Sequence, residues 1–424
     1  MASESLAVSI FAQALEASLP KNFMHKYCSL SGDILILEKT TYDLSKYKNI
    51  YLFGSGKAAY TMAKEAEAIL GDKIHKGLIV CPNDDGKLKK IKVAIGSHPL
   101  PSQMSIDAAT AMCEMMQECD ENDLYIYLLS GGSSSLMELP IYPISLNELQ
   151  ETTSLMLRNN LEIHEINCVR KHLSSIKGGR LAQMCKASGV VLVISDIIDD
   201  DLQSIGSAPL YADKSTFIEA KYILQSKNLF QIMPTSVQDV LKKGVDLEID
   251  ETPSIPLDRV KHIIISSNKQ ALDQATLTAK SKGLSVKKIS EPMKGEVTEM
   301  VNEMFKILDA SDEECIIFGG ECTVKLEGNG QGGRNQHAVL LALKKIQDQT
   351  LSVTFLSAST DGIDGNSDAA GAVVSSYSYK SDLRIDSYLK NFDSYNYLKQ
   401  SDSLIMTGPS GTNVIDIAIL IKGE

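Results

Sequence analysis

"IYLFGSGKAAYTMAKEAEAIL", residues 50–70, begins as an apolar run and ends as an alanine-rich amphipathic segment. The turn Gly54-Ser55-Gly56 separates the two parts. An apolar strand, a glycine turn and a helix with the spacing G-x-G-x-x-A fit the fingerprint of a dinucleotide-binding βα unit. Lys57 adds a cation at the helix start, where backbone amides and the helix dipole already attract phosphate. The lysine is therefore either incidental or part of a site at which phosphate is transferred.

The rest of the chain repeats this alternation of short apolar runs and helical patterns. The runs expected to form strands are Ile50–Phe53, Leu78–Cys81, Leu124–Leu129, Val190–Ile194, Val260–Ile265, Val286–Ile289, Ile316–Phe318 and Val353–Leu356. Helical spacing of apolar residues predicts helices between them, for example over residues 106–118 and 297–308. Strands that alternate with helices predict an α/β protein with mainly parallel sheets, the first of them Rossmann-like.

A chain of 424 residues is long enough for two domains. The acidic segment "KKGVDLEIDETPSIPLDRV" (residues 242–260), which contains two prolines, is the expected seam. We place an N-terminal Rossmann-like α/β domain at residues 1–243 and a C-terminal α/β domain at residues 258–424. Near the C-terminus, residues 403–407 and 414–421 are expected to form a strand pair joined by a short loop.

The composition narrows the classes of partner. The net charge of −12 argues against a nucleic-acid binder or a protein of the membrane surface. No apolar run in the sequence approaches the roughly 18–20 residues that span a bilayer, and the N-terminus lacks the basic segment of a targeting peptide. The eight cysteines form no CxxC pair and are interpreted as reduced thiols. We therefore expect a cytoplasmic protein.

A second glycine cluster, "LLSGGSSSLM" (residues 128–137), follows a predicted strand. Gly131 and Gly132 permit close approach of the backbone to a ligand, and Ser133 and Ser134 add hydroxyl donors. A phosphate cradle and a capped helix after a flexible turn both fit this pattern.

A third cluster, "GNGQGGRNQ" (residues 328–336), places Gly332 and Gly333 directly before Arg334. Arg334 stands at the start of a predicted helix, where bidentate contact with a carboxylate or a phosphate is the functional interpretation. A flexible hairpin is the alternative.

Charged residues gather near other predicted strand ends. Arg170 and Lys171 form a local cation cluster in an acidic protein, although a solvated helix face explains them as well. Asp196 ends one strand, and Asp361 and Asp364 follow another. Carboxylates at such positions suit Mg²⁺ or general-base work, and capped turns are the alternative.

The scattered histidines include one further candidate for a functional residue. His98, within "SHPLP", is the histidine that we single out. No HExxH or paired CxxC metal motif is present in the sequence.

Taken together, these stretches resemble the class II glycerate kinases, the ATP-dependent glycerate 2-kinases whose C-terminal domain is called MOFRL. The matching stretches span nearly the whole chain: "GSGKAA", "SHPLP", "LLSGGSSSL", "VRKHLSSIKGGRLA", "GGECTV", "GQGGRNQ", "STDGIDGNSDAAGA" and "TGPSGTNVIDI". The resemblance implies two α/β domains with the active site in the interdomain cleft. It also implies that ATP, with Mg²⁺, phosphorylates the 2-hydroxyl of D-glycerate to give 2-phosphoglycerate and ADP.

The resemblance and the residue chemistry together assign expected roles. The expected catalytic residues are Lys57, Arg334, Asp196 and Asp361. Nucleotide is expected at Gly54, Ser55 and Gly56, at Gly131, Gly132, Ser133 and Ser134, and at Gly332 and Gly333. The expected substrate-binding residues are Arg170, Lys171 and His98, and the expected metal ligands are Asp196, Asp361 and Asp364.

Four positions depart from the pattern of the family. Asp199 and Ala208 stand where the family usually has glycine, His337 where it has glutamate, and Ile415 where it has asparagine. These departures leave open a catalytically retired ligand-binding relative, and the glycine fingerprint leaves open an NAD(P)-dependent hydroxypyruvate reductase. The expected partners are a small-molecule substrate and a nucleotide, with no nucleic acid and no membrane. A homodimer, the exact hydroxy-acid and the nucleotide preference stay open.

Overall fold

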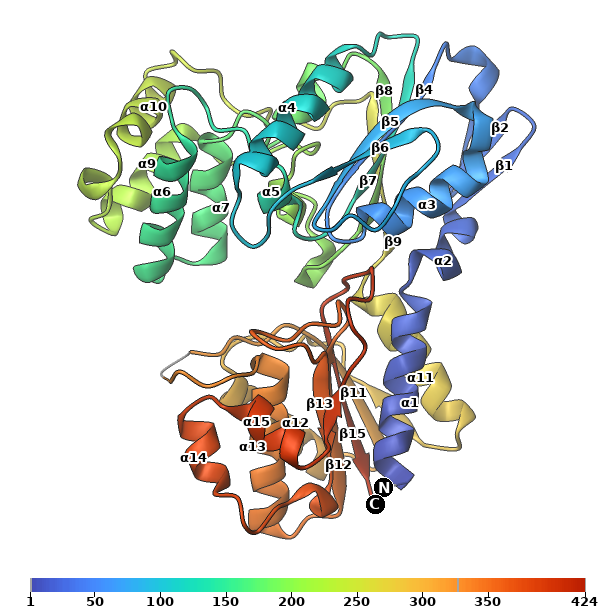
Figure 1. Cartoon of the computed structure of the whole chain (residues 1–424), viewed down its shortest axis with the longest axis vertical. Coiled ribbons are helices and arrows are strands. Elements are labelled where there is room, and N and C mark those ends of the chain that lie inside the picture. The colour runs from blue at the N-terminus through green and yellow to red at the C-terminus, as the bar shows by residue number, and fades with distance from the viewer. Residues whose placement is uncertain (1, 326–327, 424) are drawn as a thin grey trace. The chain divides into compact units, whose positions relative to one another are not determined.

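The computed structural model describes residues 2–325 and 328–423, which fold into two compact units (Figure 1). Unit 1 comprises residues 1–23, 195–199 and 266–424, and unit 2 comprises residues 24–194 and 200–265. The boundary expected between residues 243 and 258 falls inside the second segment of unit 2. None of the helices in the described residues is both long and apolar enough to cross a membrane.

The larger sheet of unit 2 has six strands in the order β6-β5-β4-β7-β8-β9. Their bounds are Ile91–Ile95 (β6), Ile74–Cys81 (β5), Ile50–Ser55 (β4), Leu124–Leu129 (β7), Ser188–Ile194 (β8) and Val260–Ser266 (β9). The pairs β4 with β5, β4 with β7, β5 with β6 and β7 with β8 are parallel. Numbered in chain order, the strands lie 3-2-1-4-5-6, which is the Rossmann order. The predicted Rossmann-like fold is confirmed in this unit.

Helices α3 (Ala59–Leu70) and α4 (Gln103–Gln117) pack against this sheet. The buried residues of α3 recur every three or four positions, at Ala59, Met62, Ala63, Ala66 and Leu70. That spacing places one apolar stripe of the helix against the strands. The helix that follows the glycine turn therefore packs on the sheet through its apolar stripe, as its sequence pattern predicts.

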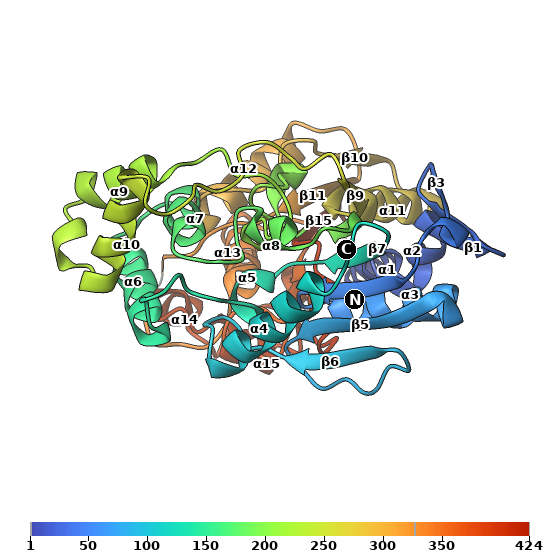
Figure 2. The same cartoon turned by 90° about the horizontal axis from the view of Figure 1, so that it is seen from above.

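Four helices of unit 2 form a group with a core of their own, to one side of the sheet (Figures 1 and 2). They are α6 (Leu146–Arg158), α7 (Ile163–His172), α9 (Phe217–Ser226) and α10 (Thr235–Val245). Unit 2 also contains the short helices α5 (Ser133–Leu136) and α8 (Arg180–Met184), and an antiparallel sheet of β1 (Cys28–Ser31), β2 (Ile34–Leu37) and β3 (Thr40–Asp43). Helix α2 (Pro20–Tyr27) spans the first change of unit.

The sheet of unit 1 is mixed. Its order is β10-β11-β15-β12-β13-β14, with bounds Val286–Lys288, Cys315–Gly320, Asp416–Lys422, Val353–Ser359, Gly371–Val374 and Leu404–Ile405. Only β10 and β11 pair in parallel, and the other neighbours are antiparallel. Mainly parallel pairing is thus found in unit 2. In unit 1, β13 returns beside β12, and the C-terminal strand β15 inserts between β11 and β12. The two C-terminal strands, β14 and β15, are not neighbours, so the expected strand pair at the C-terminus is wrong.

The helices of unit 1 are α1 (Ala2–Ala17), α11 (Asn268–Ser281), α12 (Val297–Asp309), α13 (Arg334–Gln349), α14 (Ile385–Lys390) and α15 (Ser394–Gln400). Helix α1 packs against α11, β12 and β15, all of which belong to the C-terminal half of the chain. Thr354 Oγ1 donates to Ser3 Oγ at 2.7 Å, and Thr412 Oγ1 donates to the carbonyl of Ser18 at 2.8 Å. The first helix is therefore an integral part of unit 1.

A buried ion pair joins two loops of unit 2. Lys177 and Glu138 are each only 1% exposed, and the lysine ammonium donates to the carboxylate. Ser174 Oγ and the Leu139 amide donate to the other carboxylate oxygen at 2.6 and 3.0 Å. Burial lowers the pKa of Lys177 to about 8, although the charge of Glu138 opposes this change. The pair ties the segment after α5 to the segment before α8.

Several non-glycine residues adopt the left-handed backbone region, among them three positions singled out in the sequence. Asp199 has a φ of 68°, Ala208 of 53° and Ile415 of 60°. Glycine reaches this region with little steric cost and asparagine or aspartate with a modest one, whereas other L-residues lose roughly 1–2 kcal/mol. The backbone at Ala208 and Ile415 would therefore suit glycine or asparagine better than the residues present, whereas Asp199 is tolerated.

We predict that Glu138→Gln lowers the free energy of unfolding by about 3–5 kcal/mol, because it leaves a buried ammonium without a counter-charge. Chemical denaturation followed by circular dichroism measures this change. The double variant Glu138→Gln/Lys177→Met, which removes both charges, is expected to be more stable than the single variant. Equal or greater loss in the double variant would contradict this account.

We predict that Asp199→Gly changes the free energy of unfolding by less than about 0.5 kcal/mol, because aspartate tolerates the left-handed region and the small relief of strain is offset by the added freedom of the unfolded chain. Asp199 is exposed, so little packing is lost. Asp201→Gly is the matched comparison and should destabilise, since the Asp201 carboxylate accepts from the Gln203 amide at 3.1 Å and from Ser204 Oγ at 2.7 Å. Chemical denaturation of both variants measures the two changes, and an equal loss of stability in both would contradict this account.

Candidate active site

Four predicted site residues lie together in unit 2, near the carboxyl ends of β4 and β7. In a sheet of this order, these two ends flank the point at which the strand order reverses, where ligands bind. The amide of Lys57 donates to the carbonyl of Gly131 at 2.8 Å. A Cβ atom placed on Gly132 would lie 3.1 Å from His98 Cδ2 and 3.2 Å from Lys57 Cγ. Lys57, His98 and the second glycine loop therefore share one small region.

The glycines of the first turn are required by packing. A Cβ atom on Gly54 would lie 2.9 Å from the carbonyl oxygen of Leu128, and one on Gly56 would lie 2.4 Å from the carbonyl oxygen of Ser130. The amides of this turn also donate within the protein: Gly56 to the carbonyl of Val80 at 3.1 Å, and Ala58 to Ser130 Oγ at 3.0 Å. The backbone amides at the start of α3 are thus already hydrogen-bonded to groups on or next to the neighbouring strands.

The second glycine loop differs from the first. Among the described residues, none accepts a hydrogen bond from the amides of residues 131–134. Gly132 has a φ of 80° and precedes the short helix α5, whose first amides have no partner within the helix. Four consecutive amide donors at this strand end can therefore receive an anion.

The hydroxyl groups of this loop are mostly engaged. Ser133 Oγ and Tyr127 OH lie 2.6 and 2.7 Å from Ser55 Oγ, in a buried chain of hydroxyls. Ser135 Oγ donates to the carbonyl of Gly132 at 3.2 Å. Ser55 and Ser133 thus hold the two turns together.

The two adjacent cations of α7 make different contacts. The guanidinium of Arg170 donates to the carbonyl of Ser134 at 3.1 Å, which places this side chain beside the second glycine loop. Lys171 is buried and pairs with Asp213, with Nζ 3.1 Å from Oδ1. Asp213 also accepts from Ser215 Oγ at 2.7 Å and lines a cavity of about 430 Å³ in unit 2. The Lys171–Asp213 pair was not expected from the sequence.

Arg334, in unit 1, is the centre of a charged cluster at the start of α13. Its Nε lies 2.5 Å from Asp416 Oδ2 and its second terminal nitrogen lies 3.0 Å from Asp416 Oδ1, a bidentate contact. The first terminal nitrogen lies 2.6 Å from Glu321 Oε1. Burial acts to lower the pKa of Arg334, but the hydrogen bonds and charge of Asp416 and the charge of Glu321 outweigh it and raise the pKa.

Asp364 caps the same helix from a different loop. One of its carboxylate oxygens accepts from the amide of Asn335 at 3.1 Å, and the other from the amide of Gln336 at 2.8 Å. Burial raises the pKa of Asp364 to about 6, although these amides favour the ionised form. A Cβ atom on Gly333 would lie 2.3 Å from Asp364 Oδ1, and the amide of Gly332 donates to Asn366 Oδ1 at 2.8 Å. These two glycines shape the entry to α13.

The other two candidate aspartates also follow strands of the structure. Asp361, which follows β12, accepts from Ser359 Oγ at 2.8 Å and from the amide of Ile363 at 3.0 Å. Asp196 follows β8, in the short segment that is grouped with unit 1, and both aspartates are half-buried. Within the described ranges, no three His, Cys, Asp or Glu side chains are arranged to hold a metal ion.

His337 is buried in unit 1 and stacks on Phe392, with ring centroids 4.8 Å apart. Its Nδ1 has no hydrogen-bond partner among the described residues. Burial lowers its pKa. This departure from the family pattern therefore places a neutral ring in the core beside α13.

Sequence reasoning missed the acidic partners of Arg334. Glu321 and Asp416 occur in the matched stretches "GGECTV" and "TGPSGTNVIDI", but no role was inferred for either. Glu321 lies shortly after the predicted strand Ile316–Phe318 and Asp416 lies near the start of the predicted strand 414–421, so an acidic residue near one end of each strand was the available signal.

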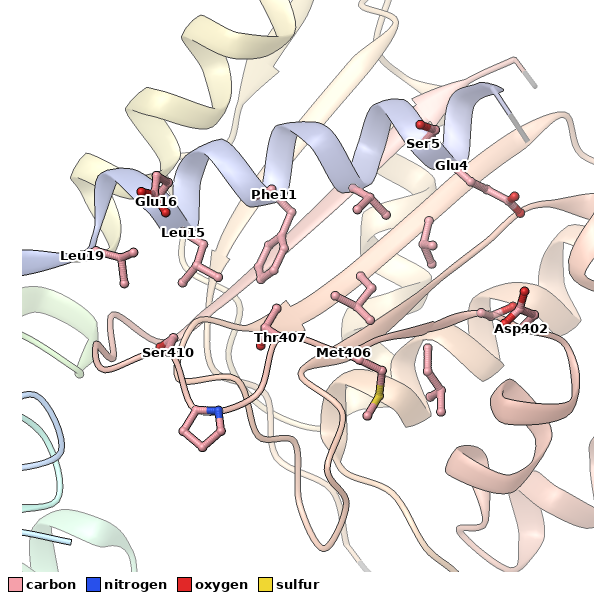
Figure 3. Close-up of a pocket in the computed structure, with 17 residues that line it drawn as sticks. Glu4, Ser5, Phe11, Leu15, Glu16, Leu19, Asp402, Met406, Thr407 and Ser410 are labelled. Atoms are coloured by element: carbon pink, nitrogen blue, oxygen red, sulfur yellow. The ribbon is translucent and has the colours of Figure 1, made fainter. Parts of the chain in front are cut away.

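A cavity of about 770 Å³ lies elsewhere in unit 1, between α1 and residues 402–410 (Figure 3). Figure 3 shows Phe11 and Leu15 of α1 on one side and Thr407 and Met406 on the other. Its lining includes none of the predicted site residues and is mostly apolar. This cavity therefore does not coincide with the predicted site residues. The place where charged residues and glycine turns lie together is the better guide to function.

Comparison with known proteins shows a match along almost the whole chain. A domain of unknown function, DUF4147, matches residues 6–242, and the MOFRL family matches residues 314–416. A glycerate 2-kinase of Pyrococcus horikoshii is 36% identical, covering 98% of this chain and 96% of the relative. A D-glycerate 2-kinase of Thermotoga maritima is also 36% identical, covering 98% and 97%.

A crystal structure of a glycerate kinase from Thermotoga maritima is 34% identical to this chain. The alignment has a TM-score of 0.84 and covers 99% of both chains. At this identity and coverage, the chain belongs to the MOFRL-containing family of the glycerate 2-kinases.

Proposed function

We propose that this protein transfers the terminal phosphoryl group of ATP to the 2-hydroxyl of D-glycerate, giving 2-phosphoglycerate and ADP. The observation that carries the proposal is the placement of Lys57 against the second glycine loop at the reversal point of the sheet, in a chain of this family. Phosphoryl transfer depends mainly on positioning and on stabilisation of charge, and this arrangement offers both.

In this proposal the amides of residues 131–134 cradle phosphate and the Lys57 ammonium neutralises the phosphoryl group that moves. Arg170 supports the cradle through its contact with Ser134. The first glycine turn acts through packing, because the amides of Gly56, Lys57 and Ala58 already donate within unit 2. His98 is exposed beside Gly132 and is assigned to contact with the substrate.

Arg334 is proposed to contact an oxyanion, either the carboxylate of the substrate or a phosphoryl oxygen. Its guanidinium is planar and always charged, which suits such a contact. Lys171 is not assigned to this role, since its ammonium is buried against Asp213.

Asp361 or Asp196 is proposed to orient or deprotonate the acceptor hydroxyl. Mg²⁺ in kinases is held by phosphates and one or two carboxylates, so the lack of a three-residue cluster in the described chain is compatible with it. Asp361 fits this requirement, whereas both oxygens of Asp364 already accept amides of α13. When bound with the nucleotide, Mg²⁺ would supply charge neutralisation of the phosphates.

The hydroxypyruvate-reductase alternative rests on the G-x-G-x-x-A spacing. In that fold the second glycine allows the backbone to approach a pyrophosphate. Here Gly56 approaches Ser130 instead, so packing accounts for the spacing. We further propose a cytoplasmic location, with which the eight buried, unpaired cysteines agree.

We predict ATP-dependent release of ADP with D-glycerate, measured by a coupled assay over a panel of hydroxy-acids. 2-Phosphoglycerate should be the product found by mass spectrometry. Oxidation of NADH by hydroxypyruvate without ADP release would favour the reductase instead. Thermal stabilisation by nucleotide without any turnover would identify a retired relative.

We predict that Lys57→Met lowers kcat/KM about 10²–10³-fold, the usual loss when one group that stabilises transition-state charge is removed. Lys64→Met on the exposed face of α3 is the matched control and should keep normal turnover. Circular dichroism and thermal unfolding of both variants test that the fold is intact. Normal turnover by a folded Lys57→Met protein would remove Lys57 from the mechanism.

A further inference from the structure

The two carboxylates around Arg334 differ sharply in exposure. The side chain of Asp416 is 2% exposed and that of Glu321 is 42% exposed. Asp416 binds Nε and one terminal nitrogen along the side edge of the guanidinium. Glu321 binds the other terminal nitrogen. One carboxylate is therefore a buried anchor, and the other meets solvent.

The end edge of the guanidinium, formed by its two terminal nitrogens, is the edge that Asp416 leaves accessible. Arginine has five N–H donors, and a side-on carboxylate uses only two of them. Glu321 occupies this edge with one oxygen at 2.6 Å. An oxyanion that approaches Arg334 from solvent therefore meets Glu321 at its preferred binding position.

The backbone of Glu321 is held in place by its neighbours. The Glu321 amide donates to the carbonyl of Met293 at 2.8 Å. The preceding Gly320 has a φ of 137°, and a Cβ atom there would lie 2.4 Å from the Met293 amide nitrogen. Withdrawal of the carboxylate from Arg334 is therefore a change of side-chain rotamer and not a movement of the strand end.

The charges of the cluster oppose the entry of an anion while Glu321 is in place. One guanidinium faces two carboxylates, and the Asp364 carboxyl also acts on it. An oxyanion added to this arrangement would meet net negative charge. Exchange of Glu321 for the oxyanion keeps the number of negative groups constant, because the oxyanion takes over the contact with Arg334.

We propose that Glu321 is an internal carboxylate that occupies the ligand-facing edge of Arg334 and gives way to an oxyanion of the substrate or nucleotide. Glu321 then competes with the ligand for Arg334 and lowers the affinity of the ligand. Asp416 holds the guanidinium of Arg334 in position. The choice of D-glycerate and ATP as ligands rests on the proposed function, whereas the exchange concerns any oxyanion that binds Arg334.

The test is Glu321→Gln, which keeps the shape of the side chain and removes its charge. We expect KM to fall by about five-fold or more for one co-substrate, in line with the loss of one like charge at a partly exposed site. A lower KM for D-glycerate assigns the oxyanion to a carboxylate, and a lower KM for ATP assigns it to a phosphoryl group. The gain should disappear in an Arg334→Lys background, which lacks the planar fork.

Asp348→Asn is the matched control for loss of one negative charge. Asp348 forms an exposed pair with Lys344 about 20 Å further along α13, at about 1.5 Å rise per residue. It should leave both KM values unchanged. An unchanged or higher KM for both co-substrates in Glu321→Gln would overturn the exchange and leave the proposed function intact.

Absence of turnover in the wild-type protein would instead count against the proposed function. The exchange is then decided by calorimetric titration of the wild-type and Glu321→Gln proteins with D-glycerate, ADP and inorganic phosphate. Tighter binding of any of these to Glu321→Gln supports the exchange. Equal or weaker binding of all three overturns it.

Discussion

Strands β4 and β7 pair in parallel, with Ile50 opposite Leu124 and Ser55 opposite Leu129. Because both strands end at the same level, the chain leaves each one through a glycine turn at the same edge of the sheet. A slip of one residue would move the turns apart by about 3.3 Å and rotate the side chains of β4 to the opposite face. The approach of Gly54 to the carbonyl of Leu128 leaves no space for a side chain there. Every role proposed for unit 2 depends on this pairing.

The protein has a net charge of −12, so it has no excess of cations. Its local positive potential therefore depends on where individual cations and backbone amides lie. Lys171 and Lys177 belong to the basic stretch of residues 170–180, yet buried carboxylates neutralise both. The amides of residues 131–134 provide partial positive charge without any ionised side chain. The Arg334 guanidinium is always charged, and the buried carboxylate of Asp416 balances that charge in unit 1.

The first half of the fold follows from local sequence pattern, and part of the second half does not. The strand, glycine turn and helix of residues 50–70 have a regular pattern that predicts their order and their packing. The antiparallel direction of β13 and the insertion of β15 depend on contacts between distant segments, which periodicity does not encode. The docking of α1 on β12 and β15 depends on such contacts as well.

The candidate site shows the same division. Lys57 and the second glycine loop were both predicted as site residues because each lies in a glycine turn that follows an apolar strand. The partners of Arg334 and Lys171 were not predicted, because Asp416 and Asp213 lie 82 and 42 residues away along the chain. Gly54 and Gly56 were interpreted as nucleotide ligands from their spacing, although the contacts that require glycine there are those with the neighbouring strand.

The placement of α1 has a consequence for biosynthesis. Helix α1 leaves the ribosome long before β12 and β15, against which it packs. At about 5–20 residues per second, roughly 20–80 seconds separate the emergence of α1 from that of its partners. During this interval the apolar stripe with Ile10 and Phe11, fully buried in the finished protein, is exposed on the nascent chain. The N-terminal helix is thus a natural target for cotranslational chaperones while unit 2 is being made.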